Sequence, residues 1–402
     1  MIVTYSLVNE LFRAFHIKRW NDRLRPMELI EMDKHAHKMI IAYCLGKYEE
    51  MKGVKLDWND IIRFGIYELL RRIVISDIKS TIYREIKKDK EAFKKLNEYI
   101  FEELEGKITD DAIKAELHDF LLNPQSRSRK EIRILEAAHI IASLWEFRII
   151  KTVNPTSYQN IKIEADLLND IVQFNDLEGV QKITSQHKIA NFVDLCSQLR
   201  FQFRWAQTPR VPNTSVLGHC MLVACVSYFF TRDIPNCPKR LYNNFFGGLF
   251  HDLPEAVTRD IISPVKRSSK EFHFLILKLE RELAEKEIFP HIEPAWIDEL
   301  KYFTQCDMQN KIVEAGSVSS RQLSVEEITN TYNKDEFVPF DGEIVSAADH
   351  LSAFLESWHS CSSGIKSDEL IESAKKISEM NRTMNLGGIP VNELYSAFLP
   401  IG

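Results

Sequence analysis

Four residues in the second half of the chain have the types and the order of a divalent metal site. They are His219, the adjacent pair His251 and Asp252, and Asp349. Imidazole nitrogens and carboxylate oxygens are donors that a catalytic divalent ion takes from a protein, with one position left open for water. Neighbours on a helix point about 100 degrees apart, so His251 and Asp252 reach one ion only near a helix end, which the following Leu-Pro favours. We therefore expect this set to activate a water molecule.

Each residue also has an ordinary interpretation. A histidine near the start of an apolar helix is more often a hydrogen-bonded core residue than a ligand, and a His-Asp dipeptide arises by chance in many proteins. Asp349 lies in the run SAADHLSAF, where a carboxylate is costly to bury unless it binds a cation; an N-cap or a pair with Arg or Lys is the alternative. The complete order of His, His-Asp and Asp is far more specific than any part of it.

The elements that carry these residues are expected to be helices. Most of the chain alternates apolar and charged residues at spacings of three and four, which is typical of amphipathic helices. Examples are HKMIIAYCLGKYEEM, EIRILEAAHIIASLWEF and GEIVSAADHLSAFLESW. The 14 Gly and 14 Pro are dispersed, and short alternating runs bounded by turn dipeptides are missing from the sequence. The prediction is an all-α fold.

Composition narrows the function classes. At 402 residues the chain is near the length at which a single core gives way to two domains. Its formal net charge of -6 gives no general attraction to nucleic acid or anionic lipid, so we expect a small-molecule substrate and no nucleic-acid partner. The seven cysteines are scattered without a CxxC pair, which indicates a reduced, cytoplasmic protein. No segment has the ~20 apolar residues of a membrane span or the pattern of an export signal, so neither is expected.

Features of the second half recur in the first half at nearly one spacing, which predicts a tandem duplication. The matched pairs are Arg19-Trp20 with Arg204-Trp205, His37 with His219, Glu68 with His251, Leu69 with Asp252, Asp77 with Asp260, and His139 with Asp349. The spacing is 182 to 185 residues for the earlier pairs and 210 for the last. The longer spacing coincides with a polar stretch at 309–342, which we interpret as an insertion. We expect a first copy at residues 1–180 and a second copy at residues 181–402.

The second copy contains a longer motif around the ligands. Its parts are Arg204-Trp205, His219, His251-Asp252-Leu-Pro-Glu255-Ala-Val-Thr258-Arg-Asp260, Ser263-Pro264-Val265-Lys266 and Ala348-Asp349. With these parts, the region from about Leu195 to Ser357 resembles the HD-domain phosphohydrolases, and among them the YfbR-like 5'-deoxynucleotidases. The resemblance implies two tandem HD-like helical bundles, the second holding one divalent ion on the four ligands. Mn2+ or Co2+ is typical of the group, with Fe2+, Ni2+, Zn2+ and Mg2+ as alternatives.

The implied reaction is hydrolysis of a 2'-deoxyribonucleoside 5'-monophosphate to nucleoside and phosphate. Arg204 can form two parallel hydrogen bonds with phosphate oxygens, and Trp205 can pack against deoxyribose. Glu255 lies about one helical turn from the ligand pair, where it can exchange a proton with the attacking water. Asp260 either binds a sugar hydroxyl or serves the leaving group, and Lys266 is assigned to substrate binding. Outside such a motif, the Arg-Trp pair would be a surface cation–π contact and the two acidic residues solvated charges.

The chain departs from the group's pattern in two places. Gly218 stands where the group usually has a Glu immediately before the first histidine, which removes an expected support for His219. The segment between Lys266 and Asp349 is longer than in the compact family pattern and is expected to shape access to the substrate.

The first copy is predicted to be metal-free and catalytically inactive. Leu69 stands in place of Asp252 and cannot coordinate, and Arg72 replaces Glu255 with a charge that opposes an ion. A differently arranged zinc site is the alternative, built from His35, His37, Glu68 and His139. The retained Arg19-Trp20 pair and Asp77 fit residual ligand binding and inherited packing equally well.

The sequence is also compatible with two alternatives to the implied reaction. One is another HD reaction, on nucleoside di- or triphosphates or on a signalling nucleotide. The other is a nucleotide-binding regulatory protein with vestigial activity. The first copy is expected to occupy the place of a partner subunit and form an internal pseudo-dimer, with a homodimer of whole chains as the alternative.

Overall fold

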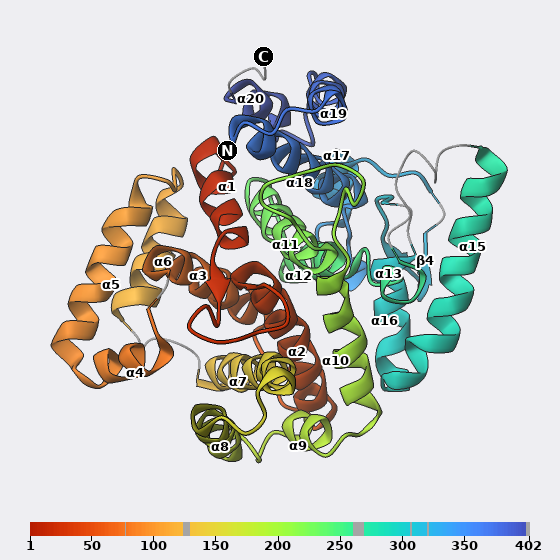
Figure 1. The fold of residues 1–402 in the computed structure, drawn as a ribbon. Helices are drawn as coiled ribbons and strands as arrows, with labels where there is room; N and C mark the ends of the chain where they lie inside the picture. Colours follow the sequence, from red (N-terminus) through yellow and green to blue (C-terminus); the bar gives the residue numbers. More distant parts are fainter. Residues whose placement is uncertain (77, 124–128, 260–268, 306–307, 320, 399–402) are drawn as a thin grey trace.

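The computed structural model describes residues 1–398 except 77, 124–128, 260–268, 306–307 and 320 (Figure 1). In the described chain the only strands form two hairpins of two-residue strands, and almost all other regular structure is helical. The all-α prediction is confirmed. Within the same residues, no helix has the length and apolar character needed to cross a membrane.

The two copies repeat one order of elements. The first copy contains α1 (Tyr5–Phe12), η1 (Arg13–Phe15), β1 (Lys18–Arg19), β2 (Leu29–Ile30), α2 (Glu31–Met51), α3 (Trp58–Ile75), α7 (Arg129–Val153), α8 (Tyr158–Val172) and α9 (Glu178–Thr184). The second copy contains α10 (Lys188–Gln198), η2 (Leu199–Phe201), α11 (Val216–Arg232), α12 (Pro238–Phe250), α18 (Gly342–Ser362), α19 (Asp368–Met380) and α20 (Val391–Ser396). Even the pairing Lys18↔Ile30 in β1–β2 returns as the isolated bridge Phe203↔Ser215.

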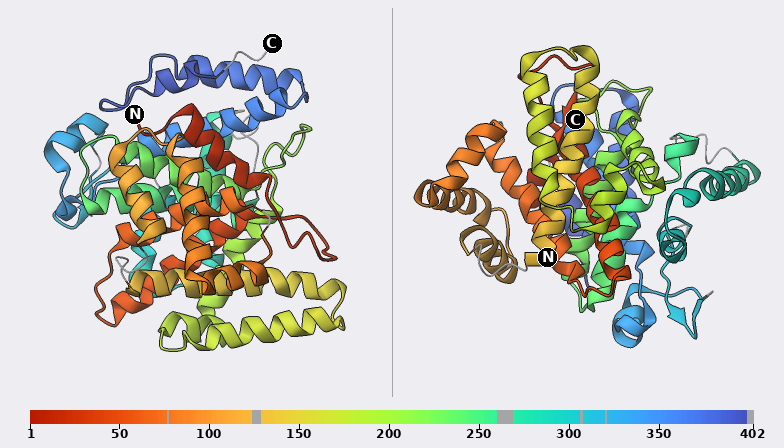
Figure 2. Two further views of the ribbon diagram at one scale, coloured as in Figure 1. Left: turned by 90° about the vertical axis from the view of Figure 1, so that its left-hand side faces the viewer. Right: turned by 90° about the horizontal axis from the view of Figure 1, so that it is seen from below.

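The copies differ in the segment between their third and fourth matched helices. The first copy has α4 (Ser80–Lys88), α5 (Lys90–Glu105) and α6 (Asp111–Leu122) there. The second has α13 (Glu255–Thr258), α15 (Lys270–Glu287), η3 (Phe289–His291), α16 (Pro294–Thr304), β3 (Val313–Glu314), β4 (Ser317–Val318), α17 (Val325–Glu327), η4 (Ile328–Tyr332) and η5 (Asp335–Phe337). These segments lie on opposite flanks of the molecule (Figures 1 and 2). The predicted insertion at 309–342 thus contains a hairpin and short helical turns.

Local signals fix the three helices that carry the predicted ligands. Ser215 caps α11 by accepting a hydrogen bond from the Gly218 N–H. Pro238 opens α12, and the helix ends at Phe250 with His251 as its C-cap, three residues before Pro254. Asp341, directly before α18, accepts two hydrogen bonds of 2.7 Å from the Arg240 guanidinium of α12. The starts and ends of these helices are therefore set by caps, breaks and a buried ion pair.

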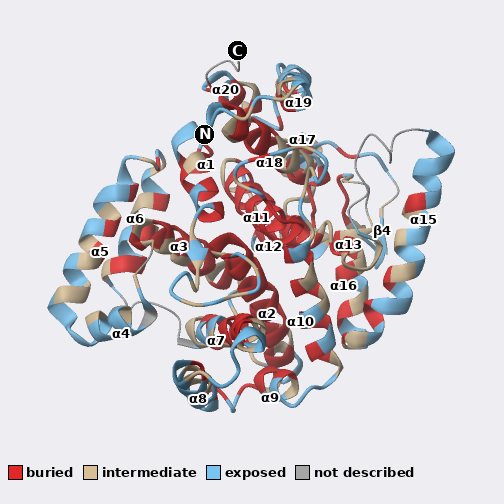
Figure 3. Cartoon of the chain, viewed as in Figure 1, coloured by how far each residue is buried: buried red, intermediate tan, exposed pale blue. Residues whose placement is uncertain are grey.

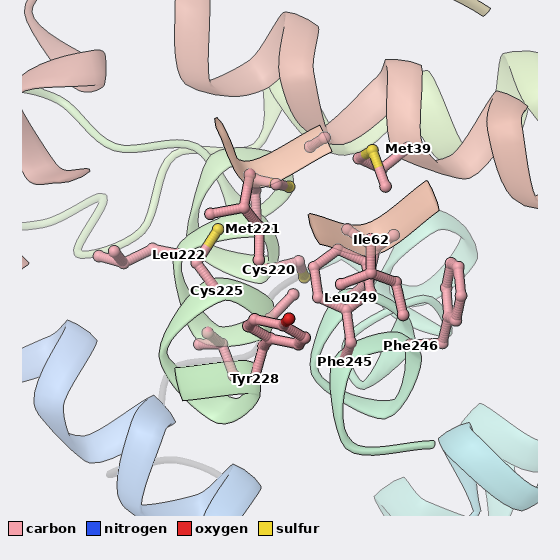
Figure 4. Packing of buried hydrophobic residues seen from close by; sticks show 14 of the residues in the cluster. Met39, Ile62, Cys220, Met221, Leu222, Cys225, Tyr228, Phe245, Phe246 and Leu249 are labelled. Atoms are coloured by element: carbon pink, nitrogen blue, oxygen red, sulfur yellow. The ribbon is translucent and has the colours of Figure 1, made fainter. Parts of the chain in front are cut away.

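One apolar core joins the two copies. Helix α2 packs against α11 and α3 against α12, so each helix meets its own counterpart. Figure 4 shows Met39 and Ile62 of the first copy in the same cluster as Cys220 and Leu249 of the second. The buried residues concentrate in these central helices, whereas α4, α5 and α15 are largely exposed (Figure 3). Contact between equivalent surfaces is the pattern of a two-fold, isologous interface.

The expected boundary at residue 180 falls inside α9, and the repeated order of elements starts again at α10. We propose that the division lies in residues 185–187, between these helices.

Candidate metal centre

The four predicted ligands come from three neighbouring helices and lie together. His219 is in the first turn of α11, His251 and Asp252 follow α12, and Asp349 is in α18. The Nε2 atom of His219 is 3.0 Å from Asp349 Oδ1, and that of His251 is 3.2 Å from Asp252 Oδ2. His219, His251 and Asp252 each offer a ligand atom within 4.8 Å of the other two. The fold therefore brings two imidazoles and the Asp252 carboxylate to the spacing of metal ligands, and places Asp349 in contact with His219.

The outer nitrogen of each imidazole is held by the protein. The His251 Nδ1–H donates to the Gly248 carbonyl at 2.7 Å, because a carbonyl can only accept. The His219 Nδ1 lies 2.9 Å from the Ser352 hydroxyl. Both Nε2 atoms are buried and lie close to the Asp349 and Asp252 carboxylates, but without the geometry of a hydrogen bond. A divalent ion fits this arrangement, since oriented second nitrogens and inward-facing lone pairs are the usual state of metal-binding histidines.

The carboxylates are held in their charged form. Burial alone would raise the pKa of the Asp349 carboxyl, but His219 and Arg204 beside it outweigh burial and hold the pKa below its usual range. Burial would also raise the pKa of the Asp252 carboxyl, but the neighbouring His251 outweighs burial and lowers this pKa. The Arg204 guanidinium approaches both ligands, at 3.8 Å from Asp252 and 3.9 Å from Asp349. The site thus combines two anionic ligands with one arginine directed at them.

Glu356 is a site residue that the sequence did not single out. It is fully buried in α18. Its Oε2 accepts hydrogen bonds from Trp205 Nε1 at 2.7 Å and Arg204 Nε at 3.3 Å, and its Oε1 accepts one from the Thr214 hydroxyl at 2.7 Å. Burial would raise its pKa, but Arg204 and Arg210 lower it to about 2. One buried carboxylate therefore fixes both members of the Arg-Trp pair.

Comparison with known families gives one match in each half of the chain. The family described as HD domain matches residues 196–378. The family described as 5'-deoxynucleotidase YfbR-like matches residues 6–181. The chain is a tandem member of the HD-domain superfamily. Comparison with the curated proteins gives no match. The two families support a metal-dependent phosphohydrolase.

The distribution of these matches differs from the resemblance drawn from the motifs. The sequence motifs predict YfbR-like features at about Leu195 to Ser357, whereas the YfbR-like match lies on the first HD copy. The second copy, which has all four ligands, matches the broader HD domain. Both copies therefore belong to one superfamily, and the match on the ligand-bearing copy is the less specific of the two.

Gly218 removes the glutamate that would be expected to support His219, and other residues of this structure take its place. Ser352, one turn after Asp349 in α18, contacts the outer nitrogen of His219. The space beside Gly218 contains Asp33 of the first copy, whose Oδ1 would lie 2.6 Å from an added Cβ. The Ser215 hydroxyl donates to the same Asp33 carboxylate. Residues of α18 and of the first copy therefore occupy the surroundings that a glutamate at 218 would take.

Two of the other predicted site residues, Glu255 and Trp205, are described by the structure. Glu255 is the first residue of α13, where it is 5% exposed and its N–H donates to the Asp252 carbonyl at 3.0 Å. Trp205 has a left-handed φ of 58 degrees and its indole N–H is bound to Glu356. Asp260 and Lys266 lie outside the described residues, as does Asp77 of the first copy.

The first HD copy repeats the Arg-Trp arrangement. Glu146 Oε2 accepts from Arg19 Nε at 2.9 Å and from Trp20 Nε1 at 2.8 Å. Trp20 has a φ of 55 degrees, close to the 58 degrees of Trp205. Glu146 and Glu356 end the matched runs ILEAAHIIASLWE and IVSAADHLSAFLE. This alignment is the sequence signal that could have identified Glu356.

The pairing of His37 with His219 is wrong. The caps Ile30 and Ser215 begin α2 and α11, so the equivalent of His219 is Lys34, at the same spacing of 185 residues. Lys34 contacts His139 as His219 contacts Asp349. His37 instead bonds the Val193 carbonyl at 3.2 Å.

The alternative zinc site of the first copy does not form among the described residues. His35 donates to the Gly65 carbonyl at 2.9 Å and so is directed away from His37, while Glu68 contacts Lys38. The one close group of metal-binding side chains in the described chain is the group in the second copy.

Proposed function

We propose that the second HD copy hydrolyses 2'-deoxyribonucleoside 5'-monophosphates, with a divalent ion held by His219, His251, Asp252 and Asp349. The observation that supports this most is the Arg204 guanidinium at 3.8 and 3.9 Å from two of these ligands. An arginine beside a divalent centre suits a phosphoryl group that contacts both. Mn2+ or Co2+ is proposed as the ion, with Fe2+, Ni2+, Zn2+ and Mg2+ as alternatives.

The chemistry that such an ion supplies is Lewis-acid polarisation of the phosphoryl oxygens and a lower pKa for the attacking water. Arg204 binds the phosphate with its terminal nitrogens, since its Nε is engaged by Glu356. Holding the guanidinium in place before substrate arrives reduces the ordering cost of binding. The buried Glu255, one turn beyond Asp252, is proposed to exchange a proton with the water.

The preference for deoxyribose rests on Trp205. Its indole N–H is fixed on Glu356, which leaves the ring face to pack against the sugar and to restrict a 2'-hydroxyl. Lys266 is proposed as a further substrate contact. Asp260 is proposed either to bind a sugar hydroxyl or to serve the leaving group.

The test is phosphate release from a panel of mono-, di- and triphosphates, with and without Mn2+ or Co2+. Asp252→Asn keeps the shape of the side chain and removes a charged ligand, so we expect the metal-dependent rate to fall by about a hundredfold or more. The matched control is Glu68→Gln, at the equivalent of His251 in the first copy, which should keep its rate. Activity that survives Asp252→Asn would overturn the metal assignment. A preference for triphosphates would keep the site and overturn the substrate.

We also propose that the chain is its own pseudo-dimer and works as a monomer in the cytoplasm. The support is that α2 and α3 already cover α11 and α12, as a partner subunit would. The six described cysteines outside the gaps are free and buried, which suits a reducing compartment. Light scattering should give a mass near 46.8 kDa, and a stable dimer of whole chains would contradict the proposal.

A further inference from the structure

The first copy gathers basic side chains where the second copy has its metal centre. Lys34, equivalent to His219, contacts the Nδ1 of His139. Arg19 Nη1 and Arg72 Nε meet on one carboxylate oxygen of Glu31, at 2.8 and 3.3 Å. Arg72 is the equivalent of Glu255 and Arg19 that of Arg204. The equivalent position is therefore lined by Lys34 and two arginines, with the buried Glu31 carboxylate between the arginines.

The exchanges between the copies reverse the charge of the site. In the second copy Asp252, Asp349 and Glu255 give a formal charge of -3, with both histidines neutral. At the equivalent positions of the first copy, Lys34, Arg72 and Glu68 give +1, because Leu69 and His139 are neutral. The change is larger than the two positive charges that a divalent ion adds. With a divalent ion the second-copy site would carry -1 by this count, whereas the first copy carries +1 at the same positions, or 0 when the buried Glu31 is included. The first copy is therefore less negative without an ion than the second copy is with one.

Lys34 in particular forms no ion pair with a carboxylate, and burial lowers the pKa of its ammonium well below the usual value, with only partial compensation from Glu31. Its side chain is 1% exposed, and none of the ion pairs among the described residues links it to a carboxylate. A buried ammonium beside a neutral imidazole is costly unless a negative charge offsets it. The neighbouring Lys38 differs, since it pairs with Glu68. An anion at Lys34 would offset the cost of burial and favour the charged form of this side chain.

Two of the residues that line the site are accessible to solvent. His139, which contacts Lys34, is exposed, and the side chain of Arg72 is 26% exposed. Arg19 and Trp20 are held on Glu146 in the arrangement that Arg204 and Trp205 have on Glu356. The first copy has thus kept the equivalent of the arginine that is proposed to bind phosphate. Lys34 and Arg72 lie beside it at positions where the second copy has acidic residues or metal ligands.

We propose that the first copy binds a phosphate monoester, such as a nucleoside 5'-monophosphate, without a metal ion. The phosphate lies against Lys34, Arg72 and His139, and the ester group extends toward Trp20. This site does not depend on catalysis by the second copy. It gives the chain a second, non-hydrolytic site for the same class of ligand.

The test is isothermal titration of the full chain with 5'-dAMP, and separately with inorganic phosphate, in buffer containing EDTA. Removing metal keeps the second copy from hydrolysing the probe. We expect one site per chain for dAMP in wild type, and at least tenfold weaker binding in Lys34→Met and in Arg72→Met. Arg204→Met, which removes the equivalent guanidinium of the second copy, should leave this affinity unchanged.

Absence of dAMP binding in EDTA would overturn the proposal, as would equal affinity in wild type and both first-copy variants. Binding lost in Arg204→Met but kept in Lys34→Met would assign the ligand to the second copy and also overturn it. Urea unfolding of each variant separates a lost site from a lost fold. If Lys34→Met is unstable, Arg72→Met still tests the site, because the Arg72 side chain is only partly buried and its replacement should disturb the fold less. The activity assay with Mn2+ decides the function of the second copy independently.

Discussion

Replacing Glu356 by Gln should weaken both the fold and the reaction, because one buried carboxylate orders the Arg-Trp pair. Its three partners, Trp205, Arg204 and Thr214, all donate hydrogen bonds to it. A glutamine has the same shape but offers an NH2 group in place of one acceptor oxygen. At least one of the three donors therefore loses its acceptor, and the guanidinium of Arg204 loses the full negative charge beside it.

The magnitude follows from the burial of the group. Breaking a buried charged pair by changing one partner costs about 3–5 kcal/mol, and a single hydrogen bond to a charged group about 1.5–3 kcal/mol. Arg204 keeps two other carboxylates within 4 Å, so the lower part of this range is expected, about 3 kcal/mol in the free energy of unfolding. An arginine no longer fixed at its Nε should lower kcat/KM by about tenfold to a hundredfold.

The assays are urea unfolding and metal-dependent phosphate release, with Glu146→Gln as the matched control. Glu146 holds Arg19 and Trp20 in the same way and is also fully buried. It should lose comparable stability and keep its kcat/KM, since the first copy has no metal ligands to serve. A Glu356→Gln protein as stable and as active as wild type would refute the reasoning. Equal losses of activity in both variants, at equal folded fraction, would show that the effect is structural.

Three further variants test the packing and charges between the copies. Lys34→Met should unfold at the same or a higher urea concentration than wild type in phosphate-free buffer, because it removes a buried ammonium without a carboxylate; a loss above about 2 kcal/mol would contradict this. Burial raises the pKa of Asp33 to about 7 from 3.8, so the stability given by its protonated form is lost as pH rises through 7. The thermal unfolding temperature should therefore fall more steeply between pH 5 and pH 8 in wild type than in Asp33→Asn. Parallel dependence on pH in the two proteins would show that Asp33 does not titrate in this range. Gly218→Ala should cost about 1–3 kcal/mol in urea unfolding, because its Cβ would lie 2.6 Å from Asp33 and 2.7 Å from Phe15, while Gly106→Ala meets nothing within 4 Å and should cost nothing.

The sequence predicted what depends on local pattern. The apolar spacing of the helices and the order of His219, His251-Asp252 and Asp349 gave the fold class and the residues that the fold brings together. Glu356 was missed because a glutamate within a helix resembles a solvated surface charge. Its burial depends on α18 meeting the loop that contains Arg204 and Trp205, which is a tertiary contact.

The assignment of His37 failed for a different physical reason. Lys34 and His37 are three residues apart, and with 3.6 residues per turn a shift of three leaves nearly the same face of the helix apolar. Matching of apolar positions therefore cannot distinguish the two registers. The helix cap and the β-bridge set the register, and they place a cation where the second copy has its first ligand.

The covered surface of α11 explains why an inactive copy can be indispensable to an active one. Every residue of this helix from Val216 to Thr231 is buried, including His219. A helix that is apolar on all sides needs neighbours on all sides. Helices α12 and α18 of the second copy supply some of them, and α2 of the first copy supplies another. Without α2, the helix that carries the first ligand would expose a continuous apolar face and lose Asp33, which anchors its Ser215 cap. The first copy therefore positions the metal centre whether or not it binds a ligand itself.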